Sequence, residues 1–249
     1  MVKTMFDTLF EKLSYIRKKI FDVPYDKQSL GHPLFYKFVL NTGIRIAVKL
    51  FGGLEVYGED NIANLEGPYV LAMVHRSGFD VAPLSLAFDR ATNHKKQINF
   101  IGKKELWETL VPFSKLITAL VGYFISAVGI FPIDRHRLRL QHETINHIKR
   151  ILDVKGIIGV FCEGTRGLGN LINVEDIKLV TIFVAAKFGV PIVPVGIHGT
   201  EKGHRHKMIV VYGAPIYVQQ GTKAKEWAKI NEQLCVALND LLNIAVSKK

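Results

Sequence analysis

Short apolar runs alternate with longer amphipathic stretches along most of this 249-residue chain, and this alternation restricts the fold more than any other feature. Strand-like runs separated by helical stretches are typical of an α/β sheet. The expected strands are Leu54 to Tyr57, Tyr69 to Met73, Ile98 to Ile101, Val128 to Ile133, Gly156 to Phe161, Ile192 to Ile197 and Met208 to Tyr212. The expected helices are Ala82 to Arg90, Glu105 to Phe124, Leu138 to Leu152, Lys178 to Phe188 and Lys223 to Val246. We therefore predict a single α/β domain with a mixed, largely parallel sheet flanked by helices.

The composition agrees with one domain and favours an anionic partner. A chain of 249 residues can bury a sizeable core, and 48% hydrophobic residues with a mean hydropathy of +0.17 are high values for a soluble protein. The net charge of +11 suits phospholipid headgroups, a phosphorylated substrate or nucleic acid, and charge alone does not choose among them. Cys162 and Cys235 lie far apart in no metal-binding spacing, which predicts a reducing compartment and no disulfide scaffold.

Two amphipathic segments open the chain. Residues 5–21 carry apolar side chains at helical spacing, and charged residues such as Lys3 and Asp7 argue against a secretory signal. From Pro33 to Phe51 a narrow polar stripe recurs every four residues, and all its charges are positive. A wide apolar face beside a cationic stripe suits a helix lying in the membrane interface, although a helix packed on the protein body has the same pattern. We predict residues 1–53 as N-terminal amphipathic membrane-associating helices and residues 54–249 as the α/β domain.

One short motif predicts a base that could deprotonate an alcohol. His75 and Asp80 lie five residues apart in a turn that contains Gly78, so the imidazole and the carboxylate can meet. The carboxylate would hold the ring in one tautomer and stabilise the imidazolium that forms when the other nitrogen accepts a proton. A His and an Asp at this separation also arise often by chance as ordinary turn residues.

The blocks that follow give this pair a context. They are Gly102-Lys103-Lys104-Glu105-Leu106, Gly129-Ile130-Phe131-Pro132-Ile133-Asp134-Arg135, Phe161-Cys162-Glu163-Gly164-Thr165-Arg166-Gly167 and Val190-Pro191-Ile192-Val193-Pro194-Val195. In this order, from about Leu54 to Val195, they resemble the glycerolipid acyltransferase family, especially bacterial 1-acyl-glycerol-3-phosphate acyltransferases. Relative to that family, Val74 replaces the usual Asn, Cys162 the usual Pro, and Gly167 a frequent Ser.

The resemblance implies transfer of a fatty acyl group from acyl-CoA or acyl carrier protein to the free sn-2 hydroxyl of lysophosphatidate, giving phosphatidic acid. His75 would act as the general base and Asp80 as the group that orients it. Another acceptor, such as glycerol 3-phosphate or a different lysolipid, is the alternative within the same chemistry, and a noncatalytic lipid-binding protein is a third. No cofactor, metal or nucleic-acid partner is expected. The expected location is the cytoplasmic face of the cell membrane, with the protein held peripherally or as a monotopic protein on anionic phospholipid.

The acceptor phosphate requires cations, and Arg166 is the strongest candidate because its planar fork suits bidentate phosphate contact and its block resembles the family's glycerophosphate-binding block. Gly164 and Thr165 belong to the same block, where Glu163 could orient the arginine or bind an acceptor hydroxyl. Lys103, Lys104 and Arg135 could complete the phosphate site, although each could also be a solvated surface charge.

Three other features have simpler interpretations. Cys162 invites a nucleophile interpretation, yet a cysteine that ends an apolar strand is usually a small buried hydrophobe. Ser77 is expected to be a turn hydroxyl. His198, His204 and His206 match no strong metal-ligand spacing and predict a basic loop. The uncharged run from Leu116 to Ile133 reaches only the lower limit for a membrane span, so we expect a buried or membrane-dipping helix followed by a strand.

Overall fold

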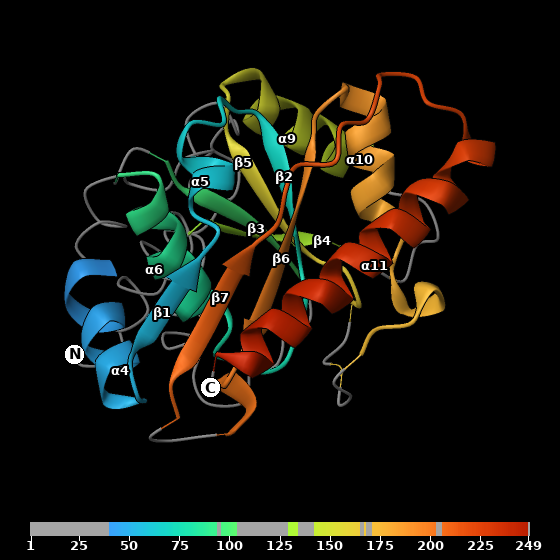
Figure 1. Ribbon diagram of the computed structural model, residues 1–249. Coiled ribbons are helices and arrows are strands. Elements are labelled where there is room, and N and C mark those ends of the chain that lie inside the picture. Colours follow the sequence, from blue (N-terminus) through green and yellow to red (C-terminus); the bar gives the residue numbers. More distant parts are fainter. Residues whose placement is uncertain are drawn as a thin grey trace, which may run out of the picture.

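A seven-stranded sheet forms the centre of the computed structural model, which describes residues 40–93, 96–103, 129–133, 142–164, 167, 171–202 and 206–248. The strand order is β1-β7-β6-β2-β5-β3-β4, and Figure 1 shows the twisted sheet between two layers of helices. The strands are β1 (Leu54–Tyr57), β2 (Tyr69–Met73), β3 (Ile98–Lys103), β4 (Ile130–Ile133), β5 (Ile157–Phe161), β6 (Ile192–His198) and β7 (Met208–Tyr212). Among the strands of the described residues, only β6 and β7 pair antiparallel, so the sheet is mixed and largely parallel, as predicted.

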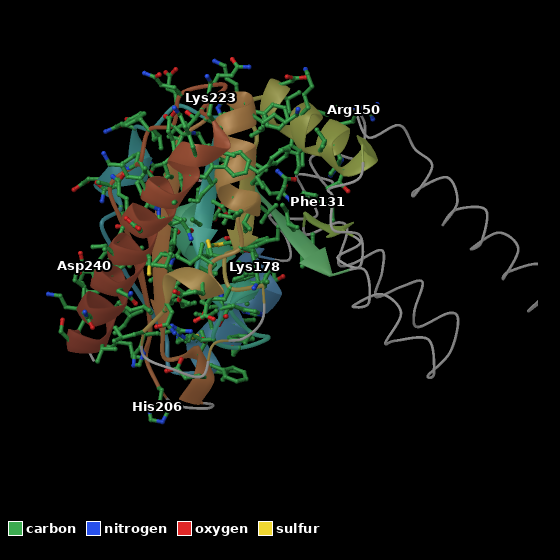
Figure 2. All side chains as sticks on the ribbon, turned by 90° about the vertical axis from the view of Figure 1, so that its right-hand side faces the viewer. Phe131, Arg150, Lys178, His206, Lys223 and Asp240 are labelled. Carbon is green, nitrogen blue, oxygen red and sulfur yellow. The ribbon has the colours of Figure 1, made fainter. Side chains whose placement is uncertain are left out.

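Helices cover both faces of the sheet. They are η1 (Leu40–Ile44), α4 (Arg45–Leu50), α5 (Asp60–Ala63), α6 (Val81–Ala91), α9 (His142–Asp153), η2 (Val174–Asp176), α10 (Val180–Phe188), η3 (Thr200–Lys202) and α11 (Ala224–Ser247). α9, α10 and α11 lie over one face, and α4, α5 and α6 lie over the other (Figure 1). Lys223 and Asp240 mark the course of α11 on one side of the molecule in Figure 2, and Phe131 and Arg150 lie on the other side.

The alternation of side chains along the strands explains this double cover. On β2, Val70 belongs to a buried cluster with Ile148 of α9 and Val184 of α10. Its neighbours Tyr69 and Leu71 point to the other face and pack in the cluster that includes α6. Because both faces are covered, the central strands are continuous apolar runs rather than alternating ones. All five residues of β2 are buried.

The expected elements agree closely with the observed ones. The strands at Leu54–Tyr57, Tyr69–Met73 and Met208–Tyr212 have the predicted bounds. β3 and β6 extend one or two residues further, because backbone pairing with β4 and β7 continues beyond the apolar runs. α5 was not predicted, since its four residues are too short for a helical period. The segments predicted as helices at 5–21 and 105–124 lie outside the described residues.

The end of the second amphipathic segment packs on the domain. Leu40 and Val48 are buried in a cluster with Leu86 of α6 and Met208 of β7. On the same short helix Ile46 and Leu50 are 58% and 71% exposed. Some apolar side chains of this segment therefore lie in the protein core and others face solvent. This supports both a helix packed on the protein body and a helix whose exposed side contacts a membrane. No helix within the described ranges has the length and apolar character needed to cross a membrane.

Candidate active site

The sequence blocks converge at one edge of the sheet. β2 lies between β5 and β6 and runs parallel to both, so the carboxyl ends of these three strands are neighbours. His75 follows β2, Glu163 follows β5 and Thr200 follows β6. Direct backbone bonds hold these ends together, since the N–H of Cys162 donates to the Met73 carbonyl at 2.9 Å. Sites in open α/β sheets form at this carboxyl edge.

His75 and Asp80 make the expected contact. His75 Nδ1 lies 2.8 Å from Asp80 Oδ2, with the Asp80 side chain fully buried and the His75 side chain 20% exposed. The imidazole also stacks on Phe161 of β5, with ring centroids 4.3 Å apart and an interplanar angle of 30°. A carboxylate on one ring nitrogen and an aromatic ring on one face fix the orientation of the imidazole.

The turn between β2 and α6 wraps around the Asp80 carboxylate. Besides the imidazole, Oδ2 accepts the backbone N–H groups of Arg76 at 2.7 Å and Ser77 at 2.9 Å. Oδ1 accepts the hydroxyls of Ser77 at 3.1 Å and Thr200 at 2.6 Å. Burial alone raises the pKa of the Asp80 carboxyl, but the hydrogen bonds from His75, Thr200 and the two backbone groups outweigh burial and hold the pKa below its usual value.

This environment determines which nitrogen of His75 can act as a base. An ionised carboxylate only accepts hydrogen bonds, so Nδ1 carries the proton that points at Asp80. In the neutral ring Nε2 then has the free lone pair. The arrangement can accept a proton at Nε2 and stabilise the resulting imidazolium through Asp80.

A buried ion pair supports the backbone on the other side of His75. Glu163 Oε2 accepts the His75 backbone N–H at 2.8 Å, and Glu163 Oε1 pairs with Arg76 Nη1 at 3.1 Å. Both side chains are only 7% exposed. The sequence suggested that Glu163 orients an arginine of its own block or binds an acceptor hydroxyl. Within the described residues its carboxylate holds the backbone of His75 and the side chain of Arg76, while Arg166 lies outside them, so both predicted roles stay predictions.

Gly167 explains one departure from the family pattern. Its N–H donates to the His75 carbonyl at 2.9 Å, so this residue lies directly against the Arg76 and Glu163 pair. A Cβ at position 167 would lie 2.1 Å from Glu163 Oε1 and 2.3 Å from Arg76 Nη1. The space that a serine would need is occupied by the Glu163 carboxylate and the Arg76 guanidinium.

The simpler interpretations of Cys162 and Ser77 agree with the structure. Cys162 is completely buried in the core cluster, and burial raises the pKa of its thiol to about 12, which suits an inert side chain rather than a nucleophile. Ser77 accepts the Phe79 N–H and donates to Asp80, as a turn hydroxyl does. Within the described part of the chain, His, Cys, Asp and Glu side chains form no group of three that could hold a metal ion.

The expected phosphate ligands lie mostly outside the described residues. Lys104, Arg135, Thr165 and Arg166 are in this class. The backbone of Lys103 ends β3 beside β4, and Gly164 closes the turn after β5 with its N–H on the Phe161 carbonyl at 3.1 Å. Both positions are at the same carboxyl edge as His75.

Sequence reasoning missed two residues that contact this machinery. The sequence analysis assigns no role to Arg76 or to Thr200. A weak signal existed for Thr200, because a hydroxyl residue directly after a buried strand lies at the edge where α/β sites form. For Arg76 the sequence contains no comparable signal, since its partner is 87 positions away.

Comparison with known proteins supplies the family. A family model described as Acyltransferase matches residues 53–198. The chloroplastic 1-acyl-sn-glycerol-3-phosphate acyltransferase of Arabidopsis thaliana is 25% identical over 184 residues, which cover 70% of this chain and 46% of that protein. The 1-acyl-sn-glycerol-3-phosphate acyltransferase of Saccharomyces cerevisiae is 27% identical over 210 residues, covering 78% of this chain and 63% of that protein. The chain thus spans less than two thirds of the length of these two relatives.

A solved structure agrees with the fold. The crystal structure of the 1-acyl-sn-glycerophosphate acyltransferase of Thermotoga maritima superimposes with a TM-score of 0.58 at 22% identity, covering 84% of this chain and 79% of that one. The matched family region contains β1 to β6 and therefore His75, Asp80 and Glu163. Because this region is more than half of the sequence, the chain belongs to the acyltransferase family, and the resemblance stated from its motifs is confirmed.

Proposed function

We propose that this protein transfers a fatty acyl group from acyl-CoA or acyl carrier protein to the free sn-2 hydroxyl of 1-acyl-glycerol-3-phosphate, giving phosphatidic acid. The observation that carries the proposal is the buried Asp80 carboxylate bonded to His75 Nδ1, which leaves Nε2 as the base on a side chain that is 20% exposed. The names of the relatives favour this acceptor over glycerol 3-phosphate or another lysolipid.

The reaction requires one proton transfer at His75. Nε2 takes the proton of the acceptor hydroxyl while the hydroxyl oxygen attacks the thioester carbonyl carbon. The new C–O bond forms, the C–S bond breaks, and the thiolate leaves and can take the proton back from the imidazolium. Asp80 stabilises the transient positive charge, so no nucleophile from the protein is needed. This accords with the inert environment of Cys162.

Recognition of the acceptor is assigned to the basic residues of the downstream blocks. Arg166 would contact the phosphate, with Thr165 and Gly164 of its block beside it. Lys103, Lys104 and Arg135 would supply further positive charge from the ends of neighbouring strands. The position of the described strand ends, all at one edge of the sheet, supports this assignment.

Replacing His75 by Ala tests the chemistry. Loss of the base should lower kcat by about 10³-fold or more, since base catalysis and the paired Asp80 charge are lost together. His206→Ala is the matched control, because His206 is an exposed histidine at the end of the molecule shown in Figure 2. The purified proteins would be assayed with a panel of lysolipids and glycerol 3-phosphate and with both donor types. Undiminished turnover by the His75 variant would refute the mechanism.

Membrane attachment is proposed for the N-terminal segment and the exposed apolar side chains of α4. Ile46 and Leu50 are exposed beside the cationic Arg45 and Lys49, which suits contact with anionic phospholipid. Ile46→Asp with Leu50→Asp should reduce cosedimentation with vesicles of mixed zwitterionic and anionic lipid. Val236→Asp on α11 is the control, because Val236 is also 61% exposed. Equal binding by the double variant and the control would contradict an α4 contact.

A further inference from the structure

Asp80 is held by two groups of donors that differ in origin. Four of the five hydrogen bonds to its carboxylate come from His75, Arg76 and Ser77, all within its own turn. The fifth comes from Thr200, 120 residues away, whose hydroxyl donates to Oδ1 at 2.6 Å. Among the described residues, Thr200 is the one donor that ties this carboxylate to a different strand. It lies just beyond the region matched by the family model, which ends at residue 198.

The turn that presents Thr200 is fixed by its own contacts. Gly199 has a φ of +93°, and a Cβ there would lie 2.3 Å from the Lys207 carbonyl oxygen. The Gly199 N–H donates to Glu201 Oε2 at 3.0 Å, and Glu201 Oε1 lies 3.3 Å from His198 Nδ1. The hydroxyl of Thr200 therefore reaches Asp80 from a turn whose geometry does not depend on the His75 turn.

Thr200 has two physical effects on Asp80. It fixes the carboxylate relative to β6, so Oδ2 stays directed at the imidazole. It also donates to a charge that burial would otherwise destabilise, because a carboxylate without donors in such a place takes up a proton readily. Ser77 donates to the same oxygen at 3.1 Å, yet it moves with the turn and cannot anchor it.

We propose that Thr200 is a positioning residue for acyl transfer, which sets the orientation and charge density of Asp80 and through them the basicity of His75 Nε2. This inference rests on the proposed role of His75 as general base. The ionisable groups around Asp80 in the described residues are His75 and Arg76 in its own turn, Glu163 after β5, and His198 and Glu201 beside Thr200. None of these is altered by a substitution at Thr200.

Thr200→Val removes the hydroxyl and keeps the size of the side chain. Without the Thr200 donor the negative charge of Asp80 is less compensated, so the carboxylate attracts the proton on His75 Nδ1 more strongly and stabilises the imidazolium form of His75 more. The acidic limb of the pH–rate profile should move upward by about half a pH unit, because a hydrogen bond to a charged group corresponds to about one unit or more and only part of it is transmitted through Asp80 to His75. Imperfect orientation of the ring should lower kcat by about 10-fold with little change in the KM of the acceptor. Thr200→Ser keeps the hydroxyl and should restore both quantities.

Thr92→Val is the matched control for loss of a buried threonine hydroxyl. Thr92 is 4% exposed at the far end of α6 and donates to the Phe88 carbonyl at 2.8 Å. Its removal should affect stability without moving the pH profile.

Should Thr200→Val fail to fold, the same measurement is made with Thr200→Ala. An unshifted acidic limb in whichever Thr200 variant folds would overturn the inference, with or without a loss of rate. Activity in His75→Ala would instead overturn the base itself, so the two failures are distinguishable.

Discussion

Two histidines of this protein make similar aromatic contacts in very different surroundings. The His75 ring lies 4.3 Å from Phe161, and the His147 ring lies 4.3 Å from Phe131 in an edge arrangement of 70°. His75 lies at the carboxyl edge of the sheet with a buried carboxylate on Nδ1, whereas His147 is buried in α9. Burial, with a smaller contribution from Arg150, lowers the pKa of His147 to about 4. An aromatic neighbour thus orients a ring, while a carboxylate partner and partial exposure make it a candidate base.

Replacing Asp80 by Asn removes the carboxylate that distinguishes His75 from His147, and it should have the largest effect on kcat among these predictions. The amide can keep its oxygen toward the backbone N–H groups, and the hydroxyls of Ser77 and Thr200 can rotate to accept from its nitrogen. The fold is therefore retained while the charge that stabilises the imidazolium is lost. We expect kcat to fall by about 10³-fold, within the range that general acid–base catalysis contributes. The measurement is steady-state acyl transfer with circular dichroism as a check of folding.

Asp89→Asn is the control for this prediction. Asp89 is 2% exposed on α6, the helix whose N-cap residue is Asp80, and lies nine positions beyond Asp80 and away from the carboxyl edge. Its conversion to an amide should leave kcat close to that of the unaltered protein. Comparable losses in both variants would mean that any buried carboxylate of α6 matters for folding, and that Asp80 has no special relation to His75.

His147 should affect the free energy of unfolding, whereas His75 should affect the rate of acyl transfer. In the unfolded chain a histidine titrates near pH 6.5, while the folded protein keeps His147 neutral down to about pH 4. As pH falls through this window the unfolded state binds a proton first, so His147 makes the free energy of unfolding decrease, by up to about 3 kcal/mol at pH 4. His147→Gln removes this contribution, with no effect on acyl transfer at neutral pH. Urea unfolding at pH 7.5, 5.5 and 4.5 measures the free energy of unfolding of the unaltered protein and of the His147→Gln variant. If this free energy changed with pH equally in the two proteins, the assigned pKa would be contradicted.

The sequence predicted the elements and the His75 to Asp80 contact well because both depend on local pattern. β2 is a run of buried residues, and both members of the His75 to Asp80 contact lie in one turn of six residues. The partners of that turn could not be predicted, since they depend on strand order. Arg76 meets Glu163 and Asp80 meets Thr200 only because β2 lies between β5 and β6.

Gly167 is a sharper probe of that long-range support. Gly167→Ala places a methyl group against Arg76 Nη1 and Glu163 Oε1, which must move although Glu163 also holds the His75 backbone. We expect a loss of about 1 to 2 kcal/mol in the free energy of unfolding and a fall in kcat of about 10-fold. The double variant Gly167→Ala with Arg76→Gln should lose less stability than the sum of the losses in the two single variants. The reason is that the shorter Gln side chain leaves space for the new methyl group. The free energies of unfolding of the unaltered protein, the two single variants and the double variant test this. If the two losses added strictly, positions 76 and 167 would be independent.

The smallest predicted effect concerns the aromatic contacts themselves. Phe161→Leu keeps an apolar side chain beside His75 but removes the stacked ring, which is worth about 0.5 to 1.5 kcal/mol. Because Asp80 still fixes Nδ1, the ring loses only part of its orientation, and kcat should fall by a few-fold. Phe131→Leu removes the equivalent contact of His147, on the side of the molecule that carries Arg150 in Figure 2, and should change stability without changing kcat. If Phe161→Leu lowered kcat as much as Asp80→Asn, stacking rather than the carboxylate would be the main determinant of the orientation of His75.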